Sequence, residues 1–161
     1  MNGDNAGAVA ISGDGSRIII GGYLNDGNGT DSGHVRVYQW NGSAWTQVGA
    51  DINGEAAGDN SGVSVSISSN GSVIAVGAHN NDGNGANSGH VRVYAWNGSS
   101  WVQRGVDLNG EAASDNFGVA LSMSQDGTKL AVGARYNDTG GSNAGHVRVF
   151  NWNGSSWVQM G

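Results

Sequence analysis

Three copies of one short pattern constrain the fold of this chain more than any other feature. Each copy starts with Gly-His-Val-Arg-Val and ends with a tryptophan, and the copies begin at Gly33, Gly89 and Gly145, 56 residues apart. An Asn-Gly pair lies between two tryptophans in every copy. This dipeptide supplies the positive φ angles of a short hairpin turn. The pattern therefore predicts a β-hairpin in each copy, with one tryptophan on either side of the turn.

The repeat extends over the whole chain of 161 residues, which we divide into units 2–49, 50–105 and 106–161. The first unit lacks several residues at its start. No segment is left for a linker or a second domain, so we expect a single repeat domain over residues 1–161. The N-terminus has no signal-peptide character and begins at a repeat boundary. This favours an excised piece of a longer array or an engineered protein.

Two further strands are expected before each hairpin. The first alternates between its faces, as in residues 119–124, and ends at an Asp-Gly or Asn-Gly turn. The second is a nearly continuous apolar run at 17–22, 73–78 and 129–134, which indicates a strand that is buried on both faces. The chain has 30 glycines and no window of helical apolar spacing without one, so the fold is expected to be all-β.

Four antiparallel strands per unit, with the second strand buried on both faces, indicate the blades of a β-propeller. A β-trefoil is the alternative, because it also has three four-stranded repeats and closes within one chain. Three blades are too few for a closed propeller, which has about four to eight. We therefore expect a homodimer that completes a six-bladed ring, with a monomeric β-trefoil as the alternative.

The third unit allows a comparison with a known family. Residues 117–122 (Phe-Gly-Val-Ala-Leu-Ser) and 130–134 (Leu-Ala-Val-Gly-Ala) precede the strand 145–150 (Gly-His-Val-Arg-Val-Phe). These stretches resemble the FG-GAP repeats of integrin α subunits and related bacterial surface proteins, and the resemblance covers all three units. It implies a propeller, seven-bladed in integrins, and an extracellular or cell-surface parent protein with an adhesion-type role. The Phe-Gly pair is complete only in the third unit.

Calcium-binding members of that family carry an Asp/Asn-rich loop between the first and second strands. Here the loop has shortened to turns such as 125–128, Gln-Asp-Gly-Thr, which offer too few oxygen ligands for calcium. A later loop, 26–31, has oxygen-bearing side chains at alternate positions, but the second unit carries Ala86 there. We therefore expect no metal site and no cofactor, with calcium in the later loop as the weaker alternative.

Each unit also carries a His-x-Arg pair, whose side chains lie on one face of the third strand. Such a pair suits an anionic or sugar ligand, and the alternative is polar packing between blades with Asp partners. The second tryptophan of each hairpin is either a sugar-stacking platform or a packing residue. The Asp-Asn pairs at 4–5, 59–60 and 115–116 are expected to form turns rather than ligand sites. The candidate ligand-binding residues are His34, Arg36, His90, Arg92, His146, Arg148, Trp45, Trp101 and Trp157.

Charge and missing motifs exclude several classes of function. The formal net charge is −6 and the basic residues do not cluster, which argues against binding to nucleic acid or anionic membranes. The chain lacks cysteine, a Gly-x-Ser-x-Gly elbow and a lysine-bearing phosphate loop, so we expect no enzyme. We predict a self-assembling structural or interaction module whose main partner is itself. A lectin-like propeller with one glycan site per blade is the alternative, and a protein ligand also remains open.

Overall fold

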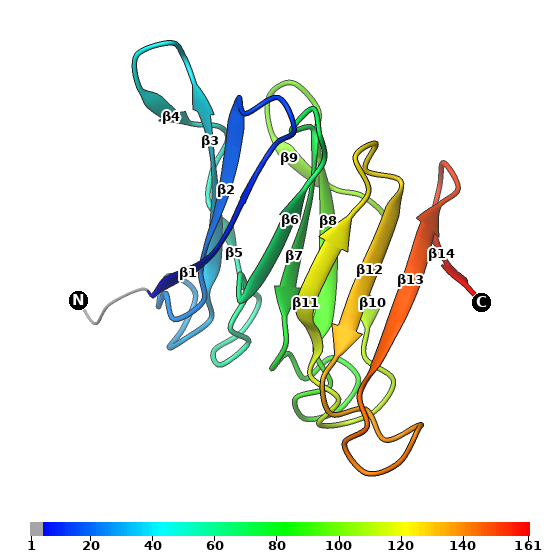
Figure 1. Ribbon diagram of the computed structural model, residues 1–161. Helices are drawn as coiled ribbons and strands as arrows, with labels where there is room; N and C mark the ends of the chain where they lie inside the picture. The colour runs from blue at the N-terminus through cyan, green and yellow to red at the C-terminus, as the bar shows by residue number, and fades with distance from the viewer. Residues whose placement is uncertain (1–4) are drawn as a thin grey trace.

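The computed structural model describes residues 5–161, and three antiparallel β-sheets follow one another through them (Figure 1). The first sheet contains β1 (Ala6–Ile11), β2 (Arg17–Gly22), β3 (His34–Trp40), β4 (Trp45–Gln47) and β5 (Ile52–Asn53). The second contains β6 (Ser64–Ile67), β7 (Val73–Ala78), β8 (His90–Trp96), β9 (Trp101–Gln103) and β10 (Leu108–Asn109). The third contains β11 (Phe117–Met123), β12 (Lys129–Ala134), β13 (His146–Trp152) and β14 (Trp157–Met160).

Each sheet is one blade, as predicted, and the strands of a blade follow one another in chain order. The first strands of adjacent sheets contact one another, β1 with β6 and β6 with β11, whereas the outer hairpins spread apart (Figure 1). Three separate sheets of this kind fit a propeller and not a β-trefoil. Residues 5–161 form an open arc and not a closed ring. Residues 2–4 of the expected first unit, including Asp4, lie outside the described residues.

The outer strand of a blade consists of two pieces, which the sequence did not predict. In the first sheet β4 pairs with the Trp40 end of β3, and β5 pairs with its His34 end. The second sheet repeats this arrangement with β9 and β10 on β8. β5 and β10 are therefore strands of the preceding blade, and the connection to the next blade begins only after them.

The first unit is one residue shorter than the others in its first strand, and a bulge absorbs the difference. The register of β11 on β12 shifts between Phe117 and Ala120, whereas that of β1 on β2 shifts between Ala6 and Ala8. Both ladders continue regularly beyond the shift. The pleat, and with it the inward and outward faces of the strands, therefore stays the same in the first blade.

Burial follows the position of a blade in the arc. Every residue of β7 is buried, because the middle blade has a neighbour on each face. In β12 the buried and more exposed residues alternate, since one face of the third blade is open. The second and third blades approach each other closely at Gly77, because a Cβ atom there would overlap the carbonyl oxygen of Gly118 in the next blade. Two apolar clusters lie between the sheets and hold the blades together.

Candidate functional site

The His-x-Arg pairs lie on β3, β8 and β13, and those of the second and third blades face the preceding blade. Arg92 forms an ion pair with Glu55, which belongs to the connection between the first and second sheets. Arg148 lies 3.7 Å from Glu111, the equivalent residue of the next connection. The two side chains of each pair thus lie on one face, as predicted. Their neighbours are residues of the protein itself.

Arg92 is held by two carboxylates from different blades. Its Nε and Nη2 atoms donate to the two oxygens of Asp107 at 2.9 and 2.8 Å, and Glu55 pairs with the same guanidinium. Burial opposes the charged guanidinium, but the hydrogen bonds to Asp107 and Glu55 outweigh it and raise the pKa of Arg92. The bond to Arg92 in turn lowers the pKa of Asp107. Arg92 and Asp107 therefore stay charged and paired near neutral pH, which suits a link between blades.

His90 lies next to this cluster but is not part of the ion pair at neutral pH. Its Nδ1 atom is 3.8 Å from Glu55 and 3.9 Å from Asp107, and its side chain is 5% exposed. Burial, with the nearby charge of Arg92, lowers the pKa of His90 although the carboxylates oppose this effect. The imidazole is therefore neutral at pH 7.

The same three residues have the composition of a metal site. Donor atoms of Glu55, His90 and Asp107 lie within 4.8 Å of one another, and imidazole with carboxylates is a set that divalent metals accept. The guanidinium of Arg92, however, pairs with both carboxylates. A cation in this place would have to displace that charge. The geometry thus favours an arginine-centred link over a metal centre.

The other two arginines show how the link varies. Arg36 donates from Nε and Nη2 to Asp51 at 3.0 and 2.8 Å, as Arg92 does to Asp107. Arg148 instead donates to the carbonyl of Asn109, and its guanidinium lies 4.2 Å from the centroid of the Phe117 ring. The Nε atom of Arg148 is buried without a hydrogen-bond partner, as is Nε2 of His146. The third site is therefore incomplete on one side.

The tryptophans pack within and between blades. The two rings of each hairpin lie 5.6, 5.3 and 5.5 Å apart, in the first, second and third blades. Trp101 donates from Nε1 to the carbonyl of Val48 at 2.9 Å, and Trp157 donates to that of Arg104 at 2.8 Å. Each bond crosses to the preceding blade. Trp45 has no preceding blade in this arc and is 41% exposed. These contacts favour packing over a sugar platform for Trp101 and Trp157.

The Asp-Asn pairs hold loops, as expected from their turn chemistry. Asp59 accepts hydrogen bonds from the backbone of Ala56 and the side chain of Asn81, at 3.1 and 3.0 Å. Asn60 has a φ angle of 54° and donates to the carbonyl groups of Tyr23 and Asp31. These bonds tie the connection that enters the second blade to loops of the first. Their polar atoms are thereby used within the fold.

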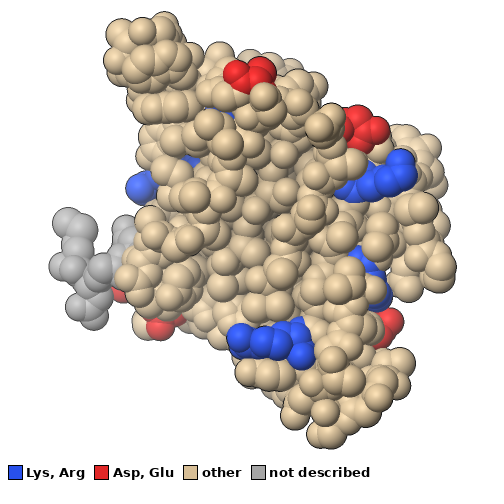
Figure 2. Space-filling model, viewed as in Figure 1, with Lys and Arg blue, Asp and Glu red and all other residues tan. Residues whose placement is uncertain are grey.

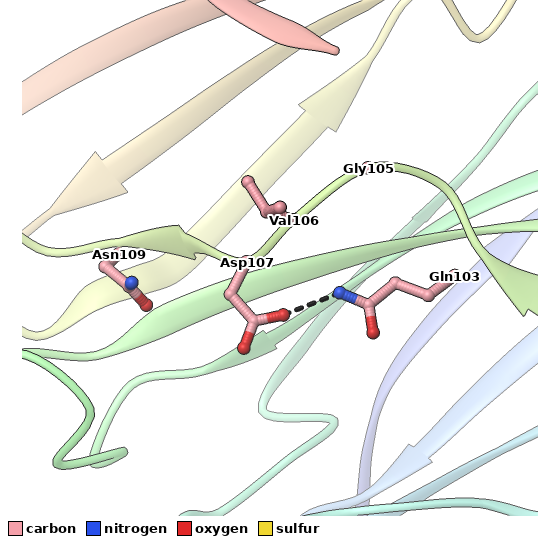
Figure 3. Close-up of a pocket in the computed structure, with 5 residues that line it drawn as sticks. All are labelled: Gln103, Gly105, Val106, Asp107 and Asn109. Carbon is pink, nitrogen blue, oxygen red and sulfur yellow. Dashed lines mark hydrogen bonds between the residues drawn. The ribbon is translucent and has the colours of Figure 1, made fainter. Parts of the chain in front are cut away.

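Two of the surface hollows are candidate places for a ligand. A wide groove of about 610 Å³ lies along the outer edge of the second blade, where Gln103 donates to Asp107 at 2.6 Å (Figure 3). A second hollow, of about 310 Å³, lies between the loops of the second and third blades. Its lining is polar and consists of Asn80, Asn87, Ser114, Asn116 and Tyr136. Sequence reasoning missed this second hollow, because its residues come from two different units.

The surface carries few charges. On the face seen in Figure 2, lysine and arginine side chains lie apart from one another and do not form one basic patch.

Among the described residues, no helix has the length and apolar character needed to cross a bilayer.

Comparisons with known proteins agree with the blade architecture. The family model of the FG-GAP repeat matches residues 53–94 and 109–150, together just over half of the chain. No curated protein sequence matches the chain significantly. Among solved structures, a protein described as a 6-phosphogluconolactonase of Bacteroides uniformis is similar, with a TM-score of 0.65 and 14% identity. The similarity covers 97% of this chain and 40% of that one.

A second similar structure is the hydrazine synthase of Kuenenia stuttgartiensis, with a TM-score of 0.57 and 13% identity. The similarity covers 99% of this chain and 36% of that one. The chain thus spans well under half the length of both proteins. At this level of identity the likeness concerns the fold alone.

Proposed function

The chain belongs to the FG-GAP repeat family, and from this premise we propose that it is a non-enzymatic interaction module that assembles with a second copy of itself. Family membership supports a structural or interaction role. FG-GAP repeats are common in extracellular proteins, so we place the parent protein outside the cell or on its surface, in adhesion. The observation that carries the proposal of self-assembly is the open, apolar face at each end of the arc.

The N-terminal face is the open side of the first blade. Val9 is 71% and Ile11 60% exposed there, and both line an apolar hollow of about 330 Å³ together with Ile18 and Ile20. Exposed apolar side chains that lie next to one another lower the free energy of a protein when another surface covers them. This face is therefore suited to bind an apolar surface of complementary shape.

The C-terminal face is the open side of the third blade. Val147 is 66% exposed, and it lines an apolar hollow of about 220 Å³ with Ala120, Ala131 and Gly133. A Cβ atom on Gly133 would meet only ordinary contacts, the nearest at 3.5 Å from Ala120. On Gly21 and Gly77, the equivalent residues of the other blades, it would overlap a backbone carbonyl of the next blade. The C-terminal face thus has the shape of a surface that receives a further blade.

The two internal interfaces supply the template for a contact between copies. In each, the His-x-Arg face of one blade packs on the opposite face of the blade before it. Ile74 and Val76, for example, join a cluster with Val35 and Val37 of the first blade. The N-terminal face is the His-x-Arg face of the first blade, and the C-terminal face is the opposite face of the third blade. A head-to-tail contact between two copies would repeat the packing that already holds the blades together.

The tryptophan bonds follow the same template. Trp101 and Trp157 donate to carbonyls at Val48 and Arg104, and the equivalent position at the end of the chain is Met160. The next residue, Gly161, has a φ angle of 81°, close to the 79° of Gly49 and the 89° of Gly105. Val48 and Met160 therefore occupy equivalent positions in their blades. We expect Trp45 of one copy to donate to the Met160 carbonyl of the second.

Two such contacts, related by a two-fold axis, join two arcs of three blades into one ring of six. Native mass spectrometry at micromolar concentration tests this arrangement. We expect twice the mass of the chain. A stable monomer would refute self-assembly, and a series of larger masses would replace the closed ring with a filament.

Gly133→Ala sharpens this test. The added methyl group fits the isolated arc but would overlap the first strand of a second copy, as at Gly77. We expect a folded protein with the circular dichroism spectrum of the wild type and the mass of a monomer. Dimers of undiminished affinity would show that the copies do not meet head to tail.

The polar hollow between the second and third blades favours a glycan as a second candidate ligand. Asn80, Asn87 and Ser114 offer the amide and hydroxyl groups that hydrogen-bond sugars, and the ring of Tyr136, 41% exposed, offers an apolar face. A glycan array is the test. Binding that is lost in Tyr136→Ala and retained in Trp45→Ala would support this site over the hairpin tryptophans.

A further inference from the structure

One strand edge of the third blade lacks the partner that its equivalents have. In the first blade, β5 pairs with the beginning of β3, placing Ile52 opposite Val35. In the second blade, β10 pairs with β8 and places Leu108 opposite Val91. The third blade has β14 alone, which pairs with β13 only from Val149 onwards. Within the described part of the chain, no strand lies along the edge at 146–147.

The side chains at this edge show what is missing. Asp51 and Asp107, which directly precede β5 and β10, accept hydrogen bonds from the Nε atoms of Arg36 and Arg92. The Nε atom of Arg148, whose side chain is 13% exposed, is buried without a partner. A buried donor without an acceptor is costly, and a carboxylate is the acceptor that this position takes in the other two blades.

An apolar side chain on the same edge is also uncovered. Val147 is 66% exposed, whereas its equivalents Val35 and Val91 are completely buried, both by the next blade and by the aliphatic residue opposite them in β5 or β10. The edge therefore lacks a carboxylate, backbone hydrogen bonds and an apolar cover.

We propose that the edge of β13 at residues 146–147 binds, from another chain, an extended peptide segment of the pattern Asp-aliphatic-Asn-Gly. Segments 51–54 and 107–110 have this pattern and bind in the same way within their own blades. The aspartate pairs with Arg148, and the aliphatic residue and the asparagine continue the sheet next to Val147 and His146. This mode is the addition of a β-strand to an exposed edge.

The glycine of the motif completes the docking through the backbone. The amide of Gly54 donates to the carbonyl of Gly33 at 2.9 Å, and that of Gly110 donates to Gly89 at 2.8 Å. The equivalent acceptor in the third blade is the carbonyl of Gly145. The partner is thus recognised by one carboxylate and by backbone bonds, so a chain that carries connections of this repeat is the source that fits.

The experiment uses a synthetic peptide with the sequence of residues 50–56, Ala-Asp-Ile-Asn-Gly-Glu-Ala, blocked at both ends. It is titrated to millimolar concentration into the 15N-labelled 161-residue protein, because a short peptide loses much conformational entropy on binding. We expect amide shifts at Gly145, His146 and Val147. The matched control peptide carries Asn in place of Asp and should bind about ten-fold more weakly, since it lacks the charge-assisted bond.

Two results would overturn the proposal. One is the absence of any shift at these amides at millimolar peptide, and the other is equal binding of the Asp and Asn peptides. In Arg148→Gln the difference between the peptides should vanish. Repeating the titration with Gly133→Ala separates this site from self-assembly, because that variant is expected to lose the dimer and keep the edge. Loss of peptide binding together with the dimer would assign the site to the dimer contact and contradict the proposal.

Discussion

Trp157 offers the most direct measure of what the hairpin tryptophans do. It is 9% exposed and packs in the cluster between the second and third blades. Its Nε1 atom also donates to the carbonyl of Arg104 at 2.8 Å. Replacing a buried tryptophan by alanine costs about 3–5 kcal/mol. Because a domain is stable by only about 5–15 kcal/mol in total, Trp157→Ala should lose a large part of the free energy of unfolding.

Urea denaturation, followed by circular dichroism, gives the magnitude. With a slope of about 2 kcal/mol per molar urea, Trp157→Ala should lower the midpoint by about 1.5–2.5 M. Trp157→Phe keeps most of the packing but leaves the Arg104 carbonyl without its donor, which costs about 1–2 kcal/mol and shifts the midpoint by less than about 1 M. The order wild type, Phe, Ala is thus expected for the midpoints.

Trp45→Ala is the matched control, measured at a protein concentration low enough to avoid association. Trp45 is 41% exposed, and among residues 5–161 no carbonyl accepts from its Nε1 atom. Its replacement should cost about 1 kcal/mol, mainly from the lost contact with Trp40. If Trp157→Ala were as stable as Trp45→Ala, the packing role that we assign to Trp157 would be refuted.

Three further outcomes follow from the packing and the charges. Gly77→Ala should lose more than about 3 kcal/mol of stability or fail to fold, because the added methyl group meets a backbone carbonyl. Gly133→Ala should change stability by less than about 1 kcal/mol, and thermal unfolding measures both variants. Burial, then the charge of Arg92, lowers the pKa of His90 below 6.5, so the unfolded chain binds more protons in mild acid and stability falls as the pH drops below about 6.5. His90→Gln should reduce this loss of stability between about pH 7 and 5. Part of the loss should remain, because burial also lowers the pKa of His79. If stability depended on pH as steeply in His90→Gln as in the wild type, His90 would not be the origin of the effect. Calcium at about 5 mM, compared with EDTA, should leave the melting temperature unchanged, and a rise of several degrees would reveal a site.

The strands that the sequence predicts well are those with local signals. The apolar run 73–78 and the Asn-Gly turn before Trp101 depend only on neighbouring residues, and β7 begins and ends where the run does. β10 has no such signal, because two residues become a strand only through pairing with β8. The exposed face of β12 is equally invisible in the sequence. The run 129–134 resembles 73–78, and only its place at the end of the arc leaves one face open.

The candidate site was also predictable only in part, where its signals are local in the sequence. The spacing of His90 and Arg92 predicts one shared face, and an aspartate partner was the expected alternative to a ligand. The contribution of Glu55 was not foreseen, although Glu55 belongs to the same unit as Arg92. The two residues lie 37 positions apart in the sequence, and only the folding of the connection against β8 brings them together. The sequence pattern of the unit contains no information about this contact.

The interfaces between blades support their arginines by different means, and this difference predicts which junction is weakest. Between the second and third blades, the buried ring of Phe117 lies under Arg148 and edge-on to Phe150 at 6.2 Å. The first interface has Ser61 in place of the ring, and there two carboxylates hold Arg92.

The junction that would close a ring has Ala6 at this position. Its arginine, Arg36, pairs with Asp51, and these side chains are 38% and 31% exposed. Ion pairs of this exposure contribute little and are screened by salt. The contact that we propose between copies would therefore depend on apolar surface rather than on charge. It should be weaker than either internal interface, so that dilution separates the two arcs before any blade unfolds.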